Sequence, residues 1–298
     1  MSLMRPLLNL WLRLTEKTHL ARAEDPETLR RSFEKKARFF FYGPRGAVYD
    51  EGALEHEGRT VPVLHVEAQE ADDGPVILYF HGGGYVFGSP RTHAAMLARL
   101  SRETKLRTVL PDYAKAPERP FPAALDDALA AYRALEWHEE GIVLGGDSAG
   151  GGLALALLGE ITRLGLPQPR GVFTFSPLAD MTFSGESLVE NAKSDVVLPA
   201  GRAREMVEMY MADHDPEDPR ATPLNAGFKG ACPVWIVVGD TEILRDDAVR
   251  MARHLRGEGV EVHDRVERGL PHVWPLFHNL LPEGRATLRD LGVWIRSL

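Results

Sequence analysis

The sequence predicts an α/β protein built on one mostly parallel β-sheet flanked by helices. Short apolar segments that suit buried strands alternate with longer segments whose apolar residues recur at helical spacing. Such alternation is typical of parallel sheets, because each helix returns the chain to the edge where the next strand begins. With 298 residues, 44% of them hydrophobic, the chain can bury one large core.

The first 40 residues are expected to form two helices ahead of the first strand. Leu7, Leu10 and Leu14 recur at helical spacing, and charged residues interrupt the apolar run too early for a secretory signal peptide. In the second segment, Asp25 can cap a helix and Pro26 can take its first helical position. No run approaches the ~20 apolar residues of a membrane span. We therefore expect a soluble, cytoplasmic protein.

Strands and helices then alternate along the rest of the chain. Strands are expected at residues 61–67, 76–80, 107–111, 142–144, 171–176, 233–240 and 260–266, and helices include residues 121–135, 245–259 and a final helix that ends at residue 298. Residues 178–215 break this rhythm and resemble an insertion. We expect residues 51–177 and 216–298 to form the core, with residues 1–50 and 178–215 as helical cap elements over it.

Composition excludes several classes of function. A formal net charge of −8, with acidic and basic residues interspersed, argues against nucleic-acid binding. The single cysteine, Cys232, excludes an internal disulfide and a multi-cysteine metal site. The sequence also lacks metal-ligand spacing, a phosphate-binding P-loop and a dinucleotide motif. We therefore expect a small-molecule partner and no cofactor or metal.

The segment GIVLGGDSAGGGLALALLGE carries the strongest chemical signal. A short apolar strand leads into Gly146, Ser148 and Gly150, and an apolar helix follows. Small residues on both sides of the serine in this G-x-S-x-G pattern permit a sharp turn that exposes the hydroxyl group. A Gly-rich turn with a serine can also cap an ordinary helix, but the strand before it and the helix after it favour a nucleophile. We expect Ser148 to be that nucleophile.

Three consecutive glycines in FHGGGYVFGS follow the apolar segment PVILYF. They could simply form a turn with positive φ angles. Beside a serine nucleophile they indicate an oxyanion hole, because bare backbone amides can bind the charged oxygen of a tetrahedral intermediate. The candidate donors are the amides of Gly83, Gly84 and Ala149. We expect His81 to orient this loop rather than to act as the base.

Three motifs in this order, HGGGYVFGS, DYAKAPERPFPAALDDA and GDSAGGG, resemble the hormone-sensitive-lipase-like branch of the α/β-hydrolase esterases. The resemblance extends from about residue 61 to the end of the chain, and departs from the family at Ala114 and Lys115, where Arg-Leu is commoner. It implies an α/β-hydrolase fold with a helical cap. It also suggests that Asp147, Glu118 and Asp126 anchor the loops beneath the site. A homodimer is expected by analogy with relatives only.

A serine nucleophile needs a base, which this fold supplies after the nucleophile and the acid in chain order. His272, in RGLPHVWPLF, lies in a loop between the last predicted strand and the final helix, where the resemblance also places the base. The other histidines downstream of Ser148 fall in helical, strand or insertion segments; they are His214, His254, His263 and His278.

The acid that orients the base is harder to assign. The segment VWIVVGDTEILRDDA offers Asp240, Glu242, Asp246 and Asp247 after a buried strand. The family pattern is usually DPLRD, and EILRD aligns on it so that Glu242 takes the position of the triad acid. Asp240 remains the alternative. Asp246 and Asp247 suit the first turn of the next helix, where its dipole favours negative charge.

These residues predict a serine carboxylesterase that hydrolyses short- to medium-chain acyl esters through an acyl-enzyme. An amidase or peptidase with the same triad is the nearer alternative. A non-catalytic small-molecule receptor is less favoured, because both serine and histidine are present.

Overall fold

The strands of one central sheet come from most of the chain, from Val48 to Glu267. The computed structural model describes residues 2–23, 25–69, 71–72 and 74–298, and within them eight strands form one sheet in the order β1-β2-β4-β3-β5-β6-β7-β8. The strands are β1 (Val48–His56), β2 (Arg59–Glu67), β3 (Val76–Phe80), β4 (Thr108–Pro111), β5 (Ile142–Asp147), β6 (Gly171–Phe175), β7 (Val234–Gly239) and β8 (Val262–Glu267). The strands from β4 through β3 to β8 are parallel, and β2 pairs antiparallel with both β1 and β4. The predicted α/β class with a mostly parallel sheet is confirmed.

Strand β1 is an element that the sequence does not predict. Most of its residues are exposed, so the strand lacks the alternation of apolar and polar residues that marks a half-buried strand. It forms a hairpin with β2 and contacts α5 (Ala123–Leu135). Because β1 begins at Val48, the last three residues of the expected cap segment 1–50 belong to the sheet.

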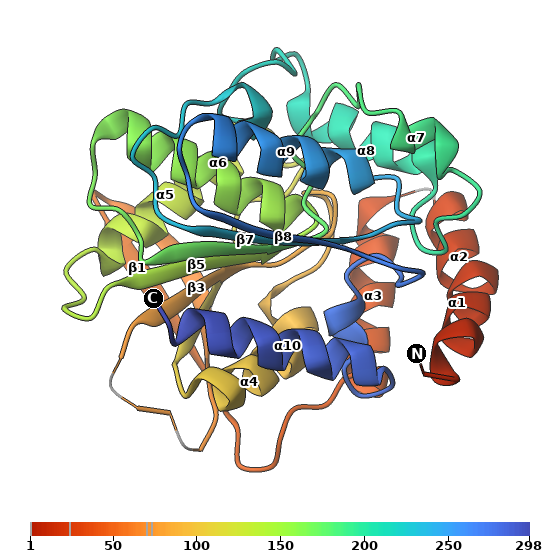
Figure 1. Cartoon of the computed structure of the whole chain (residues 1–298), viewed down its shortest axis with the longest axis horizontal. Coiled ribbons are helices and arrows are strands. Elements are labelled where there is room, and N and C mark those ends of the chain that lie inside the picture. The colour runs from red at the N-terminus through yellow and green to blue at the C-terminus, as the bar shows by residue number, and fades with distance from the viewer. Residues whose placement is uncertain (1, 24, 70, 73) are drawn as a thin grey trace.

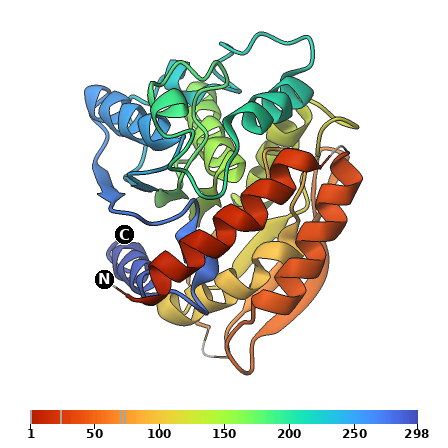
Figure 2. The same cartoon turned by 90° about the vertical axis from the view of Figure 1, so that its right-hand side faces the viewer.

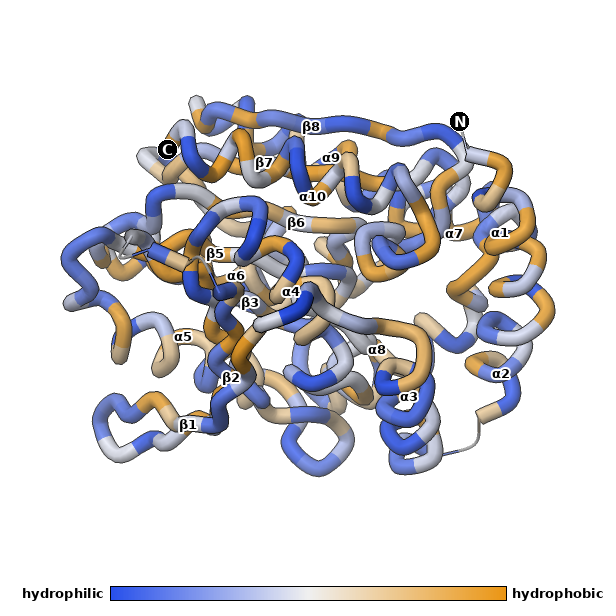
Figure 3. Tube along the Cα trace, turned by 90° about the horizontal axis from the view of Figure 1, so that it is seen from below, coloured by the Kyte–Doolittle hydropathy of each residue, from blue (hydrophilic) through white to orange (hydrophobic). Residues whose placement is uncertain are grey.

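Helices cover both faces of the sheet (Figure 1). Helices α5, α6 (Ala149–Leu164) and α9 (Arg245–Gly257) lie on one face, and α4 (Pro90–Thr104) and α10 (Pro282–Ile295) lie on the other. The central strands β3, β5, β6 and β7 are buried along their whole length, whereas the edge strand β8 is largely hydrophilic (Figure 3). The core therefore fills two layers, one on each side of the central strands.

The remaining helices lie beyond the carboxyl ends of the parallel strands. These α-helices are α1 (Met4–Leu14), α2 (Glu16–Arg22), α3 (Pro26–Phe40), α7 (Ser187–Glu190) and α8 (Ala200–Met211). The chain also forms two short 3₁₀ helices, η1 (Pro223–Asn225) and η2 (Trp274–Phe277). Figure 2 shows α1 and α3 in front of this edge of the sheet. We call α1, α2, α3 and α8 the cap helices.

The N-terminal segment forms three helices where two were expected. Its first helix breaks at Thr15, whose hydroxyl and backbone amide both donate to the carbonyl of Trp11. The predicted start of the next helix is confirmed, since the Asp25 carboxylate accepts a hydrogen bond from the amide of Thr28 at 2.8 Å and Pro26 takes the first position. No helix in the described ranges is long and apolar enough to cross a bilayer.

Candidate active site

Ser148 sits on a sharp turn between β5 and α6. Its φ of +53° and ψ of −122° lie outside the usual regions for a residue with a side chain, so the surrounding structure must hold this conformation. A Cβ atom on Gly146 would lie 2.2 Å from the carbonyl oxygen of Gly150, and one on Gly150 would lie 2.1 Å from that of Phe80. Glycine is therefore required at both positions to let the chain turn this tightly.

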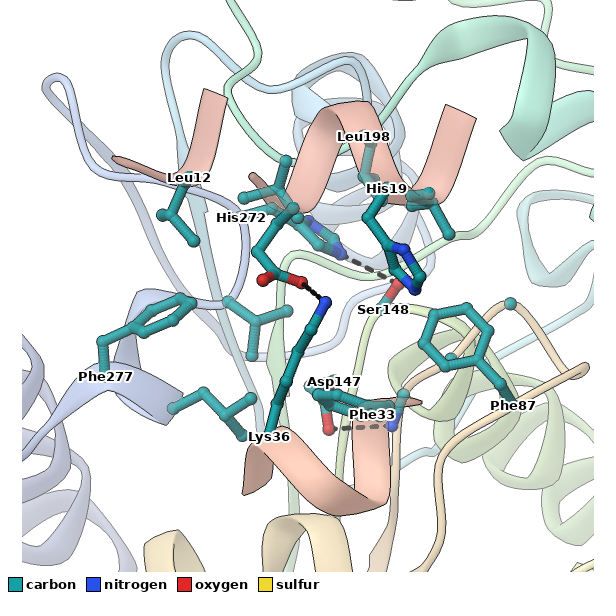
Figure 4. Close-up of a pocket in the computed structure, with 18 of the residues that line it drawn as sticks. Leu12, His19, Phe33, Lys36, Phe87, Asp147, Ser148, Leu198, His272 and Phe277 are labelled. Atoms are coloured by element: carbon teal, nitrogen blue, oxygen red, sulfur yellow. Dashed lines mark hydrogen bonds and ion pairs between the residues drawn. The ribbon is translucent and has the colours of Figure 1, made fainter. Parts of the chain in front are cut away.

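A continuous chain of hydrogen bonds joins three predicted residues. The Nε2 atom of His272 lies 2.9 Å from Oγ of Ser148, and its Nδ1 atom lies 2.6 Å from Oε2 of Glu242 (Figure 4 shows the first contact). Glu242 is 1% exposed and His272 is 7% exposed. Burial by itself would lower the pKa of His272, but the charge and the hydrogen bond of Glu242 outweigh burial and raise it above the usual value.

The Glu242 carboxylate is held by its other oxygen. Its Oε1 atom accepts hydrogen bonds from the hydroxyl of Ser176 at 2.8 Å and from the amide of Gly239 at 2.5 Å. The amide of Val273, next to the histidine, in turn donates to Ser176 Oγ at 3.2 Å. Ser176 thus connects the loop of the acid to the loop of the base. The sequence does not predict this role, because nothing in the local motif distinguishes this serine.

Asp240, the alternative acid, makes different contacts. Its Oδ1 atom accepts a hydrogen bond from the amide of Gly269 at 2.7 Å, which connects the loop after β7 to the turn after β8. No contact between Asp240 and His272 occurs among the described residues. A second carboxylate that the sequence did not single out, Asp195, is buried and accepts from the amide of Ile243 at 3.0 Å. It fixes the backbone directly after Glu242.

Two amides of the glycine loop after β3, those of Gly83 and Gly84, are free to bind a ligand in the described part of the chain. Gly83 and Gly84 have φ angles of +129° and +59°, and both line the same pocket as Ser148. A Cβ atom on Gly83 would lie 2.1 Å from the carbonyl oxygen of Phe87. Within the described part of the chain, the amides of Gly83 and Gly84 donate to no acceptor. The Ala149 amide begins α6, where no intrahelical acceptor exists.

Buried polar side chains anchor this loop from below. Oδ1 of Asp147 accepts from the hydroxyl of Tyr79 at 2.8 Å and from the amide of Gly82 at 3.0 Å, and Nε2 of His93 lies 3.2 Å away. The ring of His81 stacks on Tyr113 with 4.4 Å between centroids. Burial lowers the pKa of His81 well below its usual value, so the ring is neutral. These contacts suit a loop-orienting role for His81 and Asp147.

Glu118 and Asp126 do not lie beneath the site as expected. Glu118 is exposed and forms a two-pronged ion pair with Arg30 at 2.8 and 2.7 Å, which attaches α3 to the loop after β4. Asp126 is about half exposed and pairs with Arg59 at 3.3 Å. The anchoring position belongs to the neighbouring residue Asp127, which is buried because it is one step further around the helix.

The other candidate histidines make contacts away from Ser148. Nε2 of His254 lies 2.7 Å from the carbonyl oxygen of Ala226, His214 packs on Phe121, and His263 lies on the edge strand β8. Burial lowers the pKa of His278 to about 4. None of these four side chains has a contact with Ser148 among the described residues.

Asp246 and Asp247 lie in the first turn of α9, as predicted, and each also binds the segment after β6. Oδ2 of Asp247 accepts from the amides of Ala179 and Asp180 at 2.9 and 3.0 Å, and Oδ2 of Asp246 accepts from that of Ser187 at 2.9 Å. Burial raises the pKa of Asp247 to about 8. The two side chains therefore tie the segment after β6 to the start of α9.

A cavity of about 360 Å³ opens above Ser148, between the sheet edge and the cap helices. Its wall is largely apolar and includes Leu12, Phe33, Phe87, Leu198 and Phe277 (Figure 4). Four polar side chains of the cap interrupt this wall, namely Glu16, His19, Ser32 and Lys36. Nζ of Lys36 lies 2.9 Å from Oε2 of Glu16, and the ring of His19 points into the pocket. Burial lowers the pKa of His19, so this ring adds a neutral polar group to the wall.

Comparison with known proteins identifies the family. A sequence model described as the alpha/beta hydrolase fold matches residues 77–276. The chain belongs to this family. An esterase of Acinetobacter venetianus is 30% identical over 98% of this chain and 94% of its own, and an acetyl-hydrolase of Streptomyces hygroscopicus is 36% identical over 80% and 83%. The protein is accordingly a carboxylic ester hydrolase of the hormone-sensitive-lipase-like type.

Solved structures agree over the whole chain. A crystal structure of an esterase from the bacterial hormone-sensitive lipase family is 34% identical, covers 100% of this chain and 98% of its own, and has a TM-score of 0.91. The esterase EstE5, in a crystal soaked with p-nitrophenyl butyrate, is 33% identical, covers 100% and 99%, and has a TM-score of 0.92. The match therefore includes the N-terminal helices of the cap.

Proposed function

We propose that this esterase hydrolyses short- to medium-chain acyl esters in two steps, with Ser148 as the nucleophile. The observation that carries the proposal is the hydrogen-bonded chain from Ser148 through His272 to Glu242. Each link has the length at which a base can take a proton and an acid can orient that base.

In the first step, Oγ of Ser148 attacks the ester carbonyl carbon while its proton passes to Nε2 of His272. The carbonyl oxygen becomes an oxyanion, which accepts hydrogen bonds from the amides of Gly83, Gly84 and Ala149. When the tetrahedral intermediate collapses, the bond to the alcohol oxygen breaks and His272 gives its proton to that oxygen. The alcohol leaves, and the acyl group remains on Ser148.

In the second step, a water molecule attacks the acyl carbon after losing a proton to His272. The bond to Ser148 Oγ breaks, the proton returns to that oxygen, and the carboxylic acid leaves. Throughout, Glu242 accepts the Nδ1 hydrogen bond, which selects the tautomer with a free Nε2 and stabilises the charged ring.

Two observations support a preference for short and medium acyl chains. The cavity above Ser148 is near the lower end of the roughly 300–1,000 Å³ range of ligand pockets. Relatives named acetyl-hydrolase and ethyl acetate hydrolase, the latter from Pseudomonas putida and 29% identical over 79% of this chain, act on small acyl groups by name.

The test is the hydrolysis rate of p-nitrophenyl esters with acyl chains of two to twelve carbons. We expect a maximum at short or medium length in the wild type. Because removal of the Ser148 hydroxyl removes the nucleophile, Ser148→Ala should lose at least about 10⁴-fold in kcat with an unchanged melting temperature. Retained activity in Ser148→Ala would contradict the mechanism, and a rate that rises steadily to twelve carbons would contradict the chain-length preference. Matched anilides measure amidase activity in the same assay.

A further inference from the structure

Helix α1 and the residue before it present apolar side chains on two sides. Leu8 and Leu12 are buried against the core. On the opposite side, leucines spaced by four, three and four residues are 57–87% exposed, namely Leu3, Leu7, Leu10 and Leu14. A helix that only covers the pocket needs one apolar side. The second side is therefore unexplained by the packing of this chain.

Exposed apolar residues gather around the mouth of the catalytic pocket. Of the sixteen large apolar residues that are exposed in the described ranges, eight lie between residues 3 and 42. Four exposed residues also line the catalytic cavity, so they mark its opening: Met4, Leu7, Phe40 and Leu280. We call these four, together with Leu3, Leu10, Leu14 and Phe39, the apolar collar. Figure 2 shows α1 and α3, which carry most of the collar, on the face toward the viewer, and α1 is largely orange in Figure 3.

The same segment carries the opposite charge to the rest of the protein. Residues 1–45 contain ten lysines and arginines against five acidic residues, whereas the remaining residues contain 25 against 38. Exposed cations of this segment include Arg13 on α1, and Lys35 and Arg38 on the outer side of α3, next to Phe39 of the collar. The molecule is therefore polarised, with a basic cap on an acidic core.

We propose that the apolar collar and its cations dock on an anionic phospholipid surface. Interfacial helices bind in this way, with leucine and aromatic side chains in the boundary between headgroups and acyl chains and with lysine and arginine among the headgroups. The acidic core faces away from the surface, so charge also sets the orientation. A second copy of this chain is a poorer partner for the collar, because pairing two basic caps would bring like charges together.

Docking in this orientation turns the mouth of the pocket toward the lipid. An ester dissolved in the bilayer could then reach Ser148 without crossing water. This consequence for substrate entry rests on the proposed function, but the docking itself does not, because it requires no catalysis.

Vesicle sedimentation with the full-length Ser148→Ala protein tests the proposal without consuming the lipid. We expect at least tenfold stronger partitioning onto vesicles that contain phosphatidylglycerol than onto pure phosphatidylcholine, with much of the difference lost at high salt. Leu10→Asp with Leu14→Asp should reduce partitioning at least tenfold, since both leucines lie in the collar and outside the cavity. Lys35→Glu with Arg38→Glu should abolish the preference for the anionic lipid.

Matched controls place the same changes elsewhere on the surface. Trp137→Asp with Val293→Asp removes two exposed apolar side chains, and Arg253→Glu with Arg289→Glu reverses two exposed charges. Both controls should bind vesicles as the parent does. Binding no stronger than to phosphatidylcholine, or equal losses in the controls, would overturn the proposal. So would a stable dimer in sedimentation velocity that Leu10→Asp with Leu14→Asp dissociates, because the collar would then be a subunit interface. An inactive but lipid-binding wild type would refute only the proposed function.

Discussion

The two sides of the pocket are built by different means. Below Ser148, buried polar side chains are fixed by hydrogen bonds: Glu242 alone binds His272, Ser176 and Gly239. Above it, the cap helices present a mainly apolar wall to the pocket. Polar contacts also hold the cap, such as the pair of Lys36 with Glu16 between two cap helices and the pair of Arg30 with Glu118 outside the pocket. We call these two sides the floor and the roof.

This difference assigns the catalytic reaction to the floor and the choice of substrate to the roof. Proton transfer needs groups held within tenths of an ångström in a site with little water, which buried hydrogen bonds provide. Choice of substrate needs a surface of suitable shape, which apolar side chains provide and can adjust. Changes in the floor should therefore affect kcat strongly, and changes in the roof should affect KM and chain-length preference modestly.

Among substitutions around the pocket other than that of the nucleophile, the largest effect is expected for the acid of the floor. Glu242→Gln keeps the shape of the side chain but removes the charge that orients His272, so kcat should fall about 10³–10⁴-fold. Asp240→Asn, the matched control two residues earlier in the same loop, leaves the hydrogen bond to Gly269 in place, and its kcat should fall less than about tenfold. Steady-state kinetics of the two variants decide between the carboxylates. A larger loss in Asp240→Asn would transfer the role of the acid to Asp240.

The pH dependence of kcat/KM in the same variants tests the electrostatic role of Glu242. A purely structural role would leave this pH dependence unchanged. Because Glu242 raises the pKa of His272, the wild-type kcat/KM should fall as pH decreases through a value above 6.5, when the base becomes protonated. In Glu242→Gln the effect of burial on the pKa of His272 is no longer offset by a negative charge. The acid-side fall of kcat/KM should therefore occur at lower pH. A pH-stat follows acid release without depending on the ionisation of a coloured product. An identical limb in both proteins would contradict the coupling.

A somewhat smaller effect is expected in the glycine loop of the floor. In Gly83→Ala the new methyl group would meet the carbonyl oxygen of Phe87, so the loop must shift and misdirect its amides. We expect a loss of about 10²–10³-fold in kcat with little change in KM. Gly58→Ala is the matched control, because Gly58 also has a positive φ but a Cβ there meets open space. If both variants keep full activity, the amide of Gly83 does not stabilise the oxyanion.

Most of the floor could be predicted from short local motifs in the sequence. The turn at Ser148 and the loop at Gly83 are each encoded within a few consecutive residues, because their backbone geometry demands glycines at fixed positions. The choice between Asp240 and Glu242 stayed open, since both leave the same strand end and only the three-dimensional turn directs one of them to His272.

Contacts between segments that are distant in the chain could not be predicted from the sequence. Ser176 binds Glu242 from 66 residues away, and Asp195 binds the next residue, Ile243, from 48 residues away, and neither has a motif of its own. The exchange of Asp126 for Asp127 has a similar cause, because a one-residue step around a helix decides which carboxylate is buried. Strand β1 was missed for the opposite reason: an exposed edge strand has no buried face to impose a pattern.

The smallest effect is expected in the roof, at the ion pair between Glu16 and Lys36. The two side chains are 24% and 30% exposed, so water still screens the pair and its contribution is modest. Replacing both, as Glu16→Gln with Lys36→Met, avoids leaving one charge unpaired in the pocket wall. We expect kcat on p-nitrophenyl acetate to change less than about threefold, and KM for six- to eight-carbon esters to fall by a few-fold as the wall becomes more apolar. The single variant Lys36→Met should have a higher KM for these esters than the double variant, because Glu16 then lies in the pocket wall without its partner. A loss of kcat above about 100-fold in the double variant would abolish the distinction between floor and roof, since it would mean that the cap helices position the reacting groups as tightly as the buried network beneath them.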